Sequence, residues 1–327
     1  MKPLNILYAE PTYSSLGVLC DSVPIVLREL GHKLICISTG QLPRNMDAKN
    51  DNLWRMWMED NHFKVVWNSS SADFDLFFSR RGDTIPLQAV DEVRRRGIKT
   101  VNWEMEDPYP DVRRDVRGII SAPTYWEKTR HYNMVVGGNT LIRPWIPYAV
   151  YGENVFHEYD VEKDINVGFV GESASPLRKE WLDKFKDLGL AIASNLGWSD
   201  YNHFLARCKI VVNCHQSSTM NGRVFEAPAV ESLLVTDYVP GLEKMFKVGE
   251  EVVVYKSDGI EEVKYYLEHG EERAGVARAG LERTKRDHQL KDRVEEIIRL
   301  AVETDNRVMW EKTREASSKW DGLFPAG

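Results

Sequence analysis

Apolar and polar positions along this chain alternate between short apolar runs and longer segments with helical spacing. The first unit is the run "NILYAE", a helix-spaced segment ending at Gly31, and the run "GHKLICIST". The alternation continues through "DFDLFFS", "PLQAVDEVRRRG" and "IKTVNWEME". Short buried strands separated by amphipathic helices are typical of βαβ units with right-handed crossovers. The pattern predicts a parallel, doubly wound sheet, with "GIISAP" and "NTLIRPWIP" as its last strands.

A segment of mixed charge at 148–164 interrupts the pattern, and a second alternation follows it. Its strand-like runs are "INVGFVG", "LAIAS", "KIVVNCH", "SLLVTD" and "EVVVY". With 327 residues the chain is too long for one ordinary core. We therefore predict an α/β chain of two doubly wound, Rossmann-like domains facing a cleft. The expected bounds are 1–150 for the first domain, 151–304 for the second, and 305–327 for a C-terminal helix that packs back on the first.

Composition changes this picture little. Hydrophobic residues make up 43% of the chain and charged residues 28%, which is typical of a globular protein with a large core. No apolar run approaches the roughly 18 residues of a membrane helix, and the start runs into a strand rather than a signal peptide. We expect a cytoplasmic protein. The four cysteines form no C-x-x-C pair, so we expect free, buried thiols and no zinc site.

The charge distribution bears on possible partners. The formal net charge of -7 opposes general nucleic-acid binding. Charges nearly balance over residues 1–150, so the acidic excess lies in the second half. Arginines cluster in the first half at 80–81, 94–96 and 113–117, with acids interleaved. We interpret these clusters as solvated helix faces.

One stretch, "NGRVFEAPAVESLLVTD", carries candidate chemistry. Arg223 precedes Glu226 by one turn, and both follow a strand and a polar loop that includes Asn221. An acid near a helix N-terminus is favoured by the helix dipole even without a ligand. However, a guanidinium fork matches diphosphate oxygens, and a carboxylate can accept both hydroxyls of a ribose. Because nucleotides bind at strand ends of doubly wound sheets, the stretch indicates a nucleotide site.

The second half resembles the carboxyl-terminal region of GT-B glycosyltransferases, specifically the CgeB-like group of glycosyl transferase family 1 relatives. The matching segments are "KIVVNCH", "NGRVFEAPAVESLLVTDYVPGLEKMFKVGEEVVVY", "VKYYLEHGEERAGVARAG" and the H-x4-R pair of His288 and Arg293. The resemblance implies transfer of a sugar from a nucleotide diphosphate sugar, which we expect to be a UDP-sugar, to a hydroxyl acceptor. It assigns the donor ribose to Glu226 and the donor diphosphate to Arg223.

Two departures from the family pattern affect the sugar-facing chemistry. Related retaining enzymes often carry an acid where this chain has Ser218, and a glycine where it has Glu231. Retention and inversion therefore both stay open. Glu231 either alters the donor pocket or faces solvent.

Further candidates lie at other strand ends of the second half. The turn at Gly171 and the side chain of Arg178 are expected to approach the donor diphosphate. His215 follows an apolar strand, so it is either a donor-binding or catalytic group or a satisfied structural histidine.

In the first half, Glu104, Glu106 and Asp107 form an acidic cluster. Glu106 and Asp107 are candidate catalytic residues, with Asp107 as the base of an inverting transfer, or they are plain surface carboxylates. The loop with Tyr13, Ser14 and Ser15 either contacts the acceptor or is a simple turn.

The function predicted from these residues is a metal-independent glycosyltransferase without a cofactor. The chain has no D-x-D run, and we expect Arg223, helix amides and Arg178 to stabilise the leaving group. The acceptor stays open among a small molecule, a glycan, a spore or surface component, and a hydroxymethylated base in phage-type DNA.

Two alternatives remain. One is a catalytically silent nucleotide-sugar binding or scaffold protein, which the departures at Ser218 and Glu231 keep open. The other is an NAD-dependent oxidoreductase, which requires a G-x-G-x-x-G turn that "AEPTYSSLG" lacks.

Overall fold

The computed structural model of the chain describes two compact units. Its described residues are 1–10, 22–38, 73–82, 85–104, 128, 130–138, 144–151, 161–173, 175–215 and 219–303. The first unit is built on the described residues of Met1–Thr12, Leu27–Ile146 and Val294–Gly327. The second is built on those of Tyr13–Val26, which include the start of helix α2 (Ser22–Glu29), and of Pro147–Arg293.

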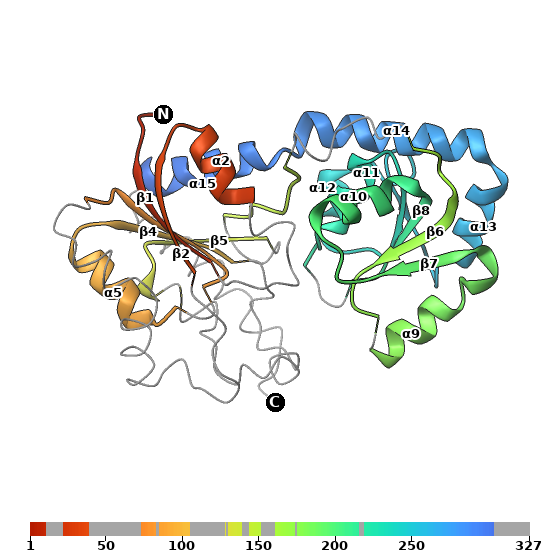
Figure 1. Ribbon diagram of the computed structural model, residues 1–327, viewed down its shortest axis with the longest axis horizontal. Coiled ribbons are helices and arrows are strands. Elements are labelled where there is room, and N and C mark those ends of the chain that lie inside the picture. The colour runs from red at the N-terminus through yellow and green to blue at the C-terminus, as the bar shows by residue number, and fades with distance from the viewer. Residues whose placement is uncertain are drawn as a thin grey trace. The chain divides into compact units, whose positions relative to one another are not determined.

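The first unit contains a five-stranded parallel sheet in the order β2-β1-β3-β4-β5 (Figure 1). The strands are β1 (Asn5–Glu10), β2 (Lys33–Ser38), β3 (Leu76–Arg80), β4 (Lys99–Glu104) and β5 (Met134–Gly137). Helix α2 (Ser22–Glu29) lies between β1 and β2 in the chain, and α5 (Leu87–Arg95) between β3 and β4. One face of the sheet contributes Leu7 and Phe77 to a core completed by Val90 and Val93 of α5.

The second unit repeats this plan with the order β10-β9-β8-β6-β7, again parallel (Figure 1). The strands are β6 (Ile165–Val170), β7 (Leu190–Ala193), β8 (Cys208–Asn213), β9 (Leu233–Thr236) and β10 (Val253–Val254). The helices are α9 (Pro176–Asp183), α10 (Trp198–Arg207), α11 (Arg223–Ala229), α12 (Leu242–Met245), α13 (Ile260–Glu268), α14 (Gly270–Asp287) and α15 (Leu290–Glu303), whose residues from Val294 belong to the first unit.

Alternating strand residues place Phe169 of β6 and Val212 of β8 on the face covered by α9, α13 and α14. They share a core with Leu182, Val263 and Val276 of those helices. The period-2 pattern of each buried strand therefore fixes which helices it packs against.

Strand order reverses at the same place in both sheets. In each unit the first strand lies between the second and the third, so successive connections leave it in opposite directions. Such a switch point opens a crevice at the carboxyl ends of the two central strands. In the second unit this place is the end of β6 and β8, and in the first it is the end of β1 and β3.

The predicted α/β fold with two parallel sheets is confirmed, and one strand was assigned wrongly. The fifth strand of the first sheet is β5, "MVVG", which the sequence reading missed because it is short and followed by glycines. The described part of "NTLIRPWIP" makes only an isolated bridge between Trp145 and Gly137, and "GIISAP" lies outside the described residues.

The return of the chain to the first unit occurs in α15. The Lys99 ammonium of β4 donates a hydrogen bond to the Val302 carbonyl, and α15 buries Val294, Ile297 and Ile298. The segment 305–327, which was expected to form the returning helix, lies outside the described residues.

Two sequence interpretations of side-chain exposure need correction. Arg80 and Arg81 are buried, with 5% and 7% of their surface exposed, because they end a central strand instead of lying on a helix. The cluster at 94–96 does lie on the exposed face of α5, where Arg95 and Arg96 pair with Glu92. Cys208 is a buried free thiol as expected, whereas Cys36 on the outer strand β2 is exposed.

Gly280 is a position of close approach between α14 and the rest of the second unit. A Cβ at this position would lie 2.5 Å from the Glu251 carbonyl oxygen and 3.2 Å from Pro228 Cβ of α11. Gly275 of the same helix has no atom within 4 Å of such a Cβ.

These two glycines give a matched pair of substitutions. Gly280→Ala is expected to destabilise the protein by about 1–3 kcal/mol, because backbone must move to admit the methyl group. Gly275→Ala is expected to stabilise it by about 0.5–1 kcal/mol through helix propensity. Urea unfolding measures both, and two changes of the same sign would contradict the packing described.

Candidate functional site

Arg223 connects the ends of the two central strands of the second unit. Its Nη1 donates to Asn213 Oδ1 at 2.5 Å, and its Nη2 donates to the Val170 carbonyl. Asn213 is the last residue of β8 and Val170 the last of β6. The guanidinium carbon also lies 4.6 Å from the centre of the Phe169 ring, within the range of a cation–π contact. Arg223 is thus fixed at the switch point of this sheet.

The turn after β6 leaves room for that guanidinium. Gly171 has φ 139°, a conformation that favours glycine, and a Cβ there would lie 2.6 Å from Arg223 Nη2. The side chain that Gly171 admits is that of Arg223, and the expected approach of this turn to the donor diphosphate stays a prediction.

Arg178 of α9 reaches the same place from the other side of the turn. Its Nη1 donates to the Glu172 carbonyl at 2.8 Å and its Nη2 to the Cys214 carbonyl at 3.1 Å. Its guanidinium carbon lies 5.6 Å from the centre of the Phe169 ring. Two guanidiniums, both anchored by neutral acceptors, therefore flank one aromatic ring.

The polar atoms around these guanidiniums favour an anionic ligand. Nε of Arg178 and Nε of Arg223 are buried donors without an acceptor among the described residues. Oδ1 of Asn221, which is an acceptor, is also buried without a partner there. The hydrogen bonds of both guanidiniums within the described chain go to neutral oxygens, and the Arg223 charge also acts on the nearby Glu226 carboxyl. Hydrogen-bond donors that are already held in place stabilise a bound negative charge without having to move.

Glu226 lies one turn along α11 and is 6% exposed. Its Oε2 accepts a hydrogen bond of 2.5 Å from the Tyr201 hydroxyl of α10. Burial raises the pKa of the Glu226 carboxyl, while the Tyr201 hydrogen bond and the Arg223 charge act in the opposite direction. Burial and the neighbouring Glu226 raise the pKa of Tyr201 well above its usual range, so the phenol keeps its proton.

Helix α11 does not supply the free amides that the sequence suggested. It has seven residues, and the amides of Val224, Phe225 and Glu226 already donate to the Asn221 and Gly222 carbonyls. Side chains, not the helix terminus, therefore provide the donors for an anion here.

Asn213 and Asp237 organise the remaining loop. Asn213 Oδ1 also accepts from Asn221 Nδ2 at 3.0 Å, and its Nδ2 donates to Thr236 Oγ1 at 3.0 Å. Asp237 accepts the backbone amide of His215 and lies 2.6 Å from its Nδ1. The His215 side chain is 2% exposed, so Asp237 and burial hold it within the strand-end loop.

Of the site residues predicted from sequence, six come together at this switch point: Gly171, Arg178, His215, Asn221, Arg223 and Glu226. The structure adds Phe169, Tyr201, Asn213 and Asp237. The acid that closes "SLLVTD" marked Asp237 in the sequence, but nothing in the local pattern of α10 indicated Tyr201.

The first-unit candidates are placed only in part. Tyr13, Ser14, Ser15, Glu106 and Asp107 lie outside the described residues, as does Ser218 of the second unit. Glu104 is buried and pairs with the Lys128 ammonium at 2.5 Å, so it is not a surface carboxylate.

The backbone conformation of Glu231 accounts for the glycine that related enzymes have at this position. It follows α11 with φ 57°, the left-handed conformation that favours glycine, and its carboxylate lies 3.4 Å from Arg278 Nε on the exposed side of α14. The left-handed conformation at this turn favours glycine, and the Glu231 side chain is partly exposed beside Arg278.

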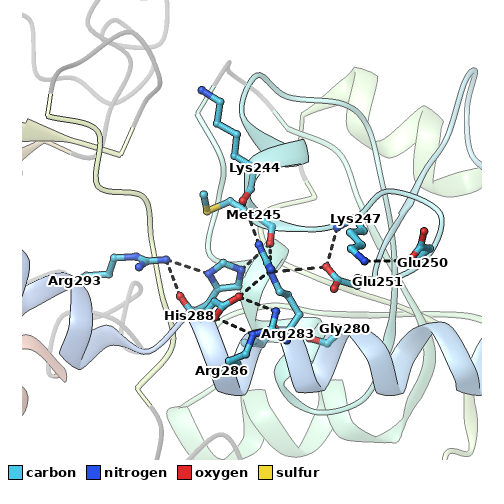
Figure 2. Close-up of polar contacts among 12 residues, drawn as sticks. Lys244, Met245, Lys247, Glu250, Glu251, Gly280, Arg283, Arg286, His288 and Arg293 are labelled. Carbon is cyan, nitrogen blue, oxygen red and sulfur yellow. Dashed lines mark hydrogen bonds and ion pairs between the residues drawn. The ribbon is translucent and has the colours of Figure 1, made fainter.

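The H-x4-R pair lies where α14 meets α15, and Figure 2 shows His288 between Arg293 and the Met245 carbonyl. His288 Nε2 is 3.0 Å from the Met245 carbonyl and Nδ1 is 3.0 Å from Arg293 Nη2, so the ring donates through Nε2 and accepts through Nδ1. The His288 carbonyl and the Leu290 amide bond to Val150, where the chain enters the second unit. This pair has a structural role.

Neither a metal site nor a membrane helix is seen in the described chain. No group of three or more His, Cys, Asp or Glu side chains is arranged to hold a metal ion among the described residues. No helix in that same part has the length and apolar character to span a bilayer.

A family model described as glycosyl transferase-like matches residues 115–299, more than half of the chain. The chain belongs to this glycosyl transferase-like family. The predicted enzyme class and GT-B recognition are confirmed, whereas the CgeB-like subgroup stays a prediction. No curated protein matches the sequence of this glycosyltransferase significantly.

Solved structures with the same fold include enzymes of sugar transfer at low identity. Sucrose-phosphate synthase from Thermosynechococcus elongatus has a TM-score of 0.61 at 9% identity, covering 90% of this chain and 98% of that one. HepE from Anabaena, in complex with UDP and glucose, has a TM-score of 0.62 at 12% identity, covering 92% and 100%. An alpha-glucosyltransferase in complex with UDP and DNA has a TM-score of 0.56 at 10% identity, covering 90% and 100%. These likenesses establish the GT-B fold of the chain.

Burial of His288 gives a pH prediction. Burial lowers the pKa of His288 to about 4, from about 6.5 in the unfolded chain. Between these pH values the unfolded state binds more protons than the folded state. The contribution of neutral His288 to the free energy of unfolding is therefore fully present above pH 6.5 and is lost as the pH falls toward 4. We expect a loss of up to roughly 3 kcal/mol from this group. Unfolding free energies of His288→Gln should fall less steeply over this range than those of wild type or of the exposed-residue control His203→Gln.

The left-handed turn gives a second prediction. Glu231→Gly is expected to stabilise the protein by about 0.5–1 kcal/mol, because glycine adopts φ 57° without strain. Glu231→Ala keeps the strain and should give no such gain. Thermal unfolding measures both variants, and an equal effect of the two would contradict the backbone explanation.

Proposed function

We propose that this glycosyltransferase uses a nucleoside diphosphate sugar, with a UDP-sugar as the expected donor, bound at the carboxyl ends of β6 and β8. The observation that supports this most is the anchored pair Arg178 and Arg223 beside Glu226. Guanidiniums match the diphosphate, and a carboxylate one helical turn away matches the ribose hydroxyls. UDP in the HepE structure agrees with this class of donor.

The proposed reaction transfers the sugar from a diphosphate oxygen to a hydroxyl oxygen. The bond between the anomeric carbon and the diphosphate breaks, and its electron pair leaves with the diphosphate. The acceptor oxygen bonds to the anomeric carbon, and its proton passes to a base, for which Asp107 and Glu106 stay candidates. Arg178 and Arg223 stabilise the charge that develops on the leaving diphosphate.

We propose that this charge stabilisation requires neither a metal ion nor a cofactor. Two guanidiniums supply positive charge where the diphosphate would lie, and each keeps N–H groups beyond those bonded to protein. Activity retained in excess EDTA is the expected result.

For the acceptor we propose a hydroxyl of a small molecule or glycan. The alpha-glucosyltransferase with this fold was solved with DNA, but the net charge of -7 here opposes a phosphate-rich acceptor. Transfer to a DNA acceptor that falls steeply with added salt would favour DNA instead.

The GT-B fold also occurs in a putative UDP-N-acetylglucosamine 2-epimerase from Listeria monocytogenes, with a TM-score of 0.54. Fold alone therefore does not decide the reaction. A catalytically silent donor-binding protein is the second candidate, and the absence of both donor hydrolysis and transfer in a binding-competent protein would favour it.

The donor assignment predicts selective stabilisation by one class of ligand. In EDTA, one of the UDP-, GDP-, ADP- or dTDP-sugars is expected to raise the unfolding temperature of the wild type, since ligand binding stabilises the folded state. Arg223→Lys should lower the affinity for that ligand by at least about tenfold, because lysine cannot reproduce the forked contacts of the guanidinium. The control Arg207→Lys, in an exposed pair with Asp164, should bind as wild type does. Stabilisation by NAD alone, or by none of the sugars, contradicts the proposal.

A further inference from the structure

The contact between Tyr201 and Glu226 joins two helices at the floor of the proposed donor site. Tyr201 lies in the first half of α10, and Glu226 is the fourth residue of α11. Their oxygens are 2.5 Å apart in partly buried surroundings. Because the phenol keeps its proton, Tyr201 is the donor and the Glu226 carboxylate the acceptor.

This hydrogen bond makes the two carboxylate oxygens of Glu226 different. Oε2 is occupied by the Tyr201 hydroxyl, whereas Oε1 receives no hydrogen bond from the described residues. Oε1 faces Gly222, where a Cβ would lie only 2.7 Å away. Gly222 therefore provides the room that the Glu226 carboxylate occupies. Oε1, which receives no hydrogen bond from the described residues, is the oxygen with capacity to accept from a ligand.

We propose that Tyr201 is a positioning residue for donor recognition, which holds Glu226 through Oε2 so that Oε1 accepts hydroxyls of the donor ribose. This inference rests on the nucleotide-sugar site proposed above. One carboxylate oxygen has two lone pairs, so it can accept from two adjacent hydroxyls. The arrangement selects a ribonucleotide over its 2′-deoxy counterpart.

The same contact favours the ionised form of the carboxylate. Burial alone would favour the neutral acid, which cannot accept through both oxygens, and the Tyr201 hydrogen bond opposes this rise in the Glu226 pKa. Without the phenol, Glu226 is expected to take up a proton at higher pH. Donor binding should then fail at a higher pH than in wild type.

Binding of UDP, GDP and ADP, each beside its 2′-deoxy counterpart, tests this by titration calorimetry between pH 5 and 8. For the nucleotide that wild type binds, Tyr201→Phe is expected to lower the affinity for the ribonucleotide about tenfold. The affinity for its 2′-deoxy form should fall much less. The pH at which nucleotide binding is lost on acidification should be higher in this variant than in wild type. Tyr201→His, which can also donate to Oε2, should recover part of the affinity.

A matched control is available elsewhere on the chain. The Tyr265 hydroxyl donates to Glu272 Oε2 at 2.7 Å on the exposed side of α13 and α14. Tyr265→Phe removes the same kind of contact and should leave affinity, pH profile and ribose preference unchanged.

The outcomes separate this inference from the proposed function. No binding of any nucleoside diphosphate by wild type overturns the donor site itself. If the wild type binds a nucleotide and Tyr201→Phe binds it with the same affinity, pH dependence and ribose preference, only the role of Tyr201 is overturned. In a Glu226→Gln background, Tyr201→Phe should reduce nucleotide affinity little further. A full additional loss of affinity would show that Tyr201 acts other than through Glu226.

Discussion

The placement of the Arg223 guanidinium between the ends of β6 and β8 is the constraint on which the site depends. The strand order of the second sheet reverses at these two strands, which is where ligands bind in doubly wound sheets. Arg223 bonds to the last residue of each strand and stacks against Phe169. Its charge is thereby fixed at these strand ends, one helical turn from the buried Glu226 carboxylate. The turn at Gly171 has no side chain because this guanidinium occupies the space.

The other site residues follow from that placement. Starting α11 with Arg223 brings Glu226 one turn further along, against Tyr201 of the neighbouring helix α10. Asn213, which accepts from Arg223, also fixes Asn221 and the end of β9 through Thr236. Arg178 brings a second positive charge to the same aromatic ring. The result is a rigid group of donors with one buried carboxylate, which suits a ligand that carries a diphosphate and a sugar hydroxyl pair.

Much of this arrangement could be predicted from sequence because it depends on local patterns. Buried strands such as "KIVVNCH" indicated the sheet, and the placement of Arg223 and Glu226 after a strand indicated where these candidate residues come together. What failed depended on tertiary context. Arg80 and Arg81 resemble a surface cluster in sequence, yet they end a central strand and are buried. The helix amides of α11 were expected to bind an anion, but a seven-residue helix uses them internally. Tyr201 could not be recognised, since only folding brings α10 beside α11.

The central claim is that the donor diphosphate lies between Arg178 and Arg223 with its ribose on Glu226. A crystal structure of the protein with a bound nucleoside diphosphate tests this most directly. The account predicts diphosphate oxygens within hydrogen-bond distance of both guanidiniums beside Gly171, and ribose hydroxyls on Oε1 of Glu226. A nucleotide bound elsewhere, or one whose ribose lies away from Glu226, would contradict it.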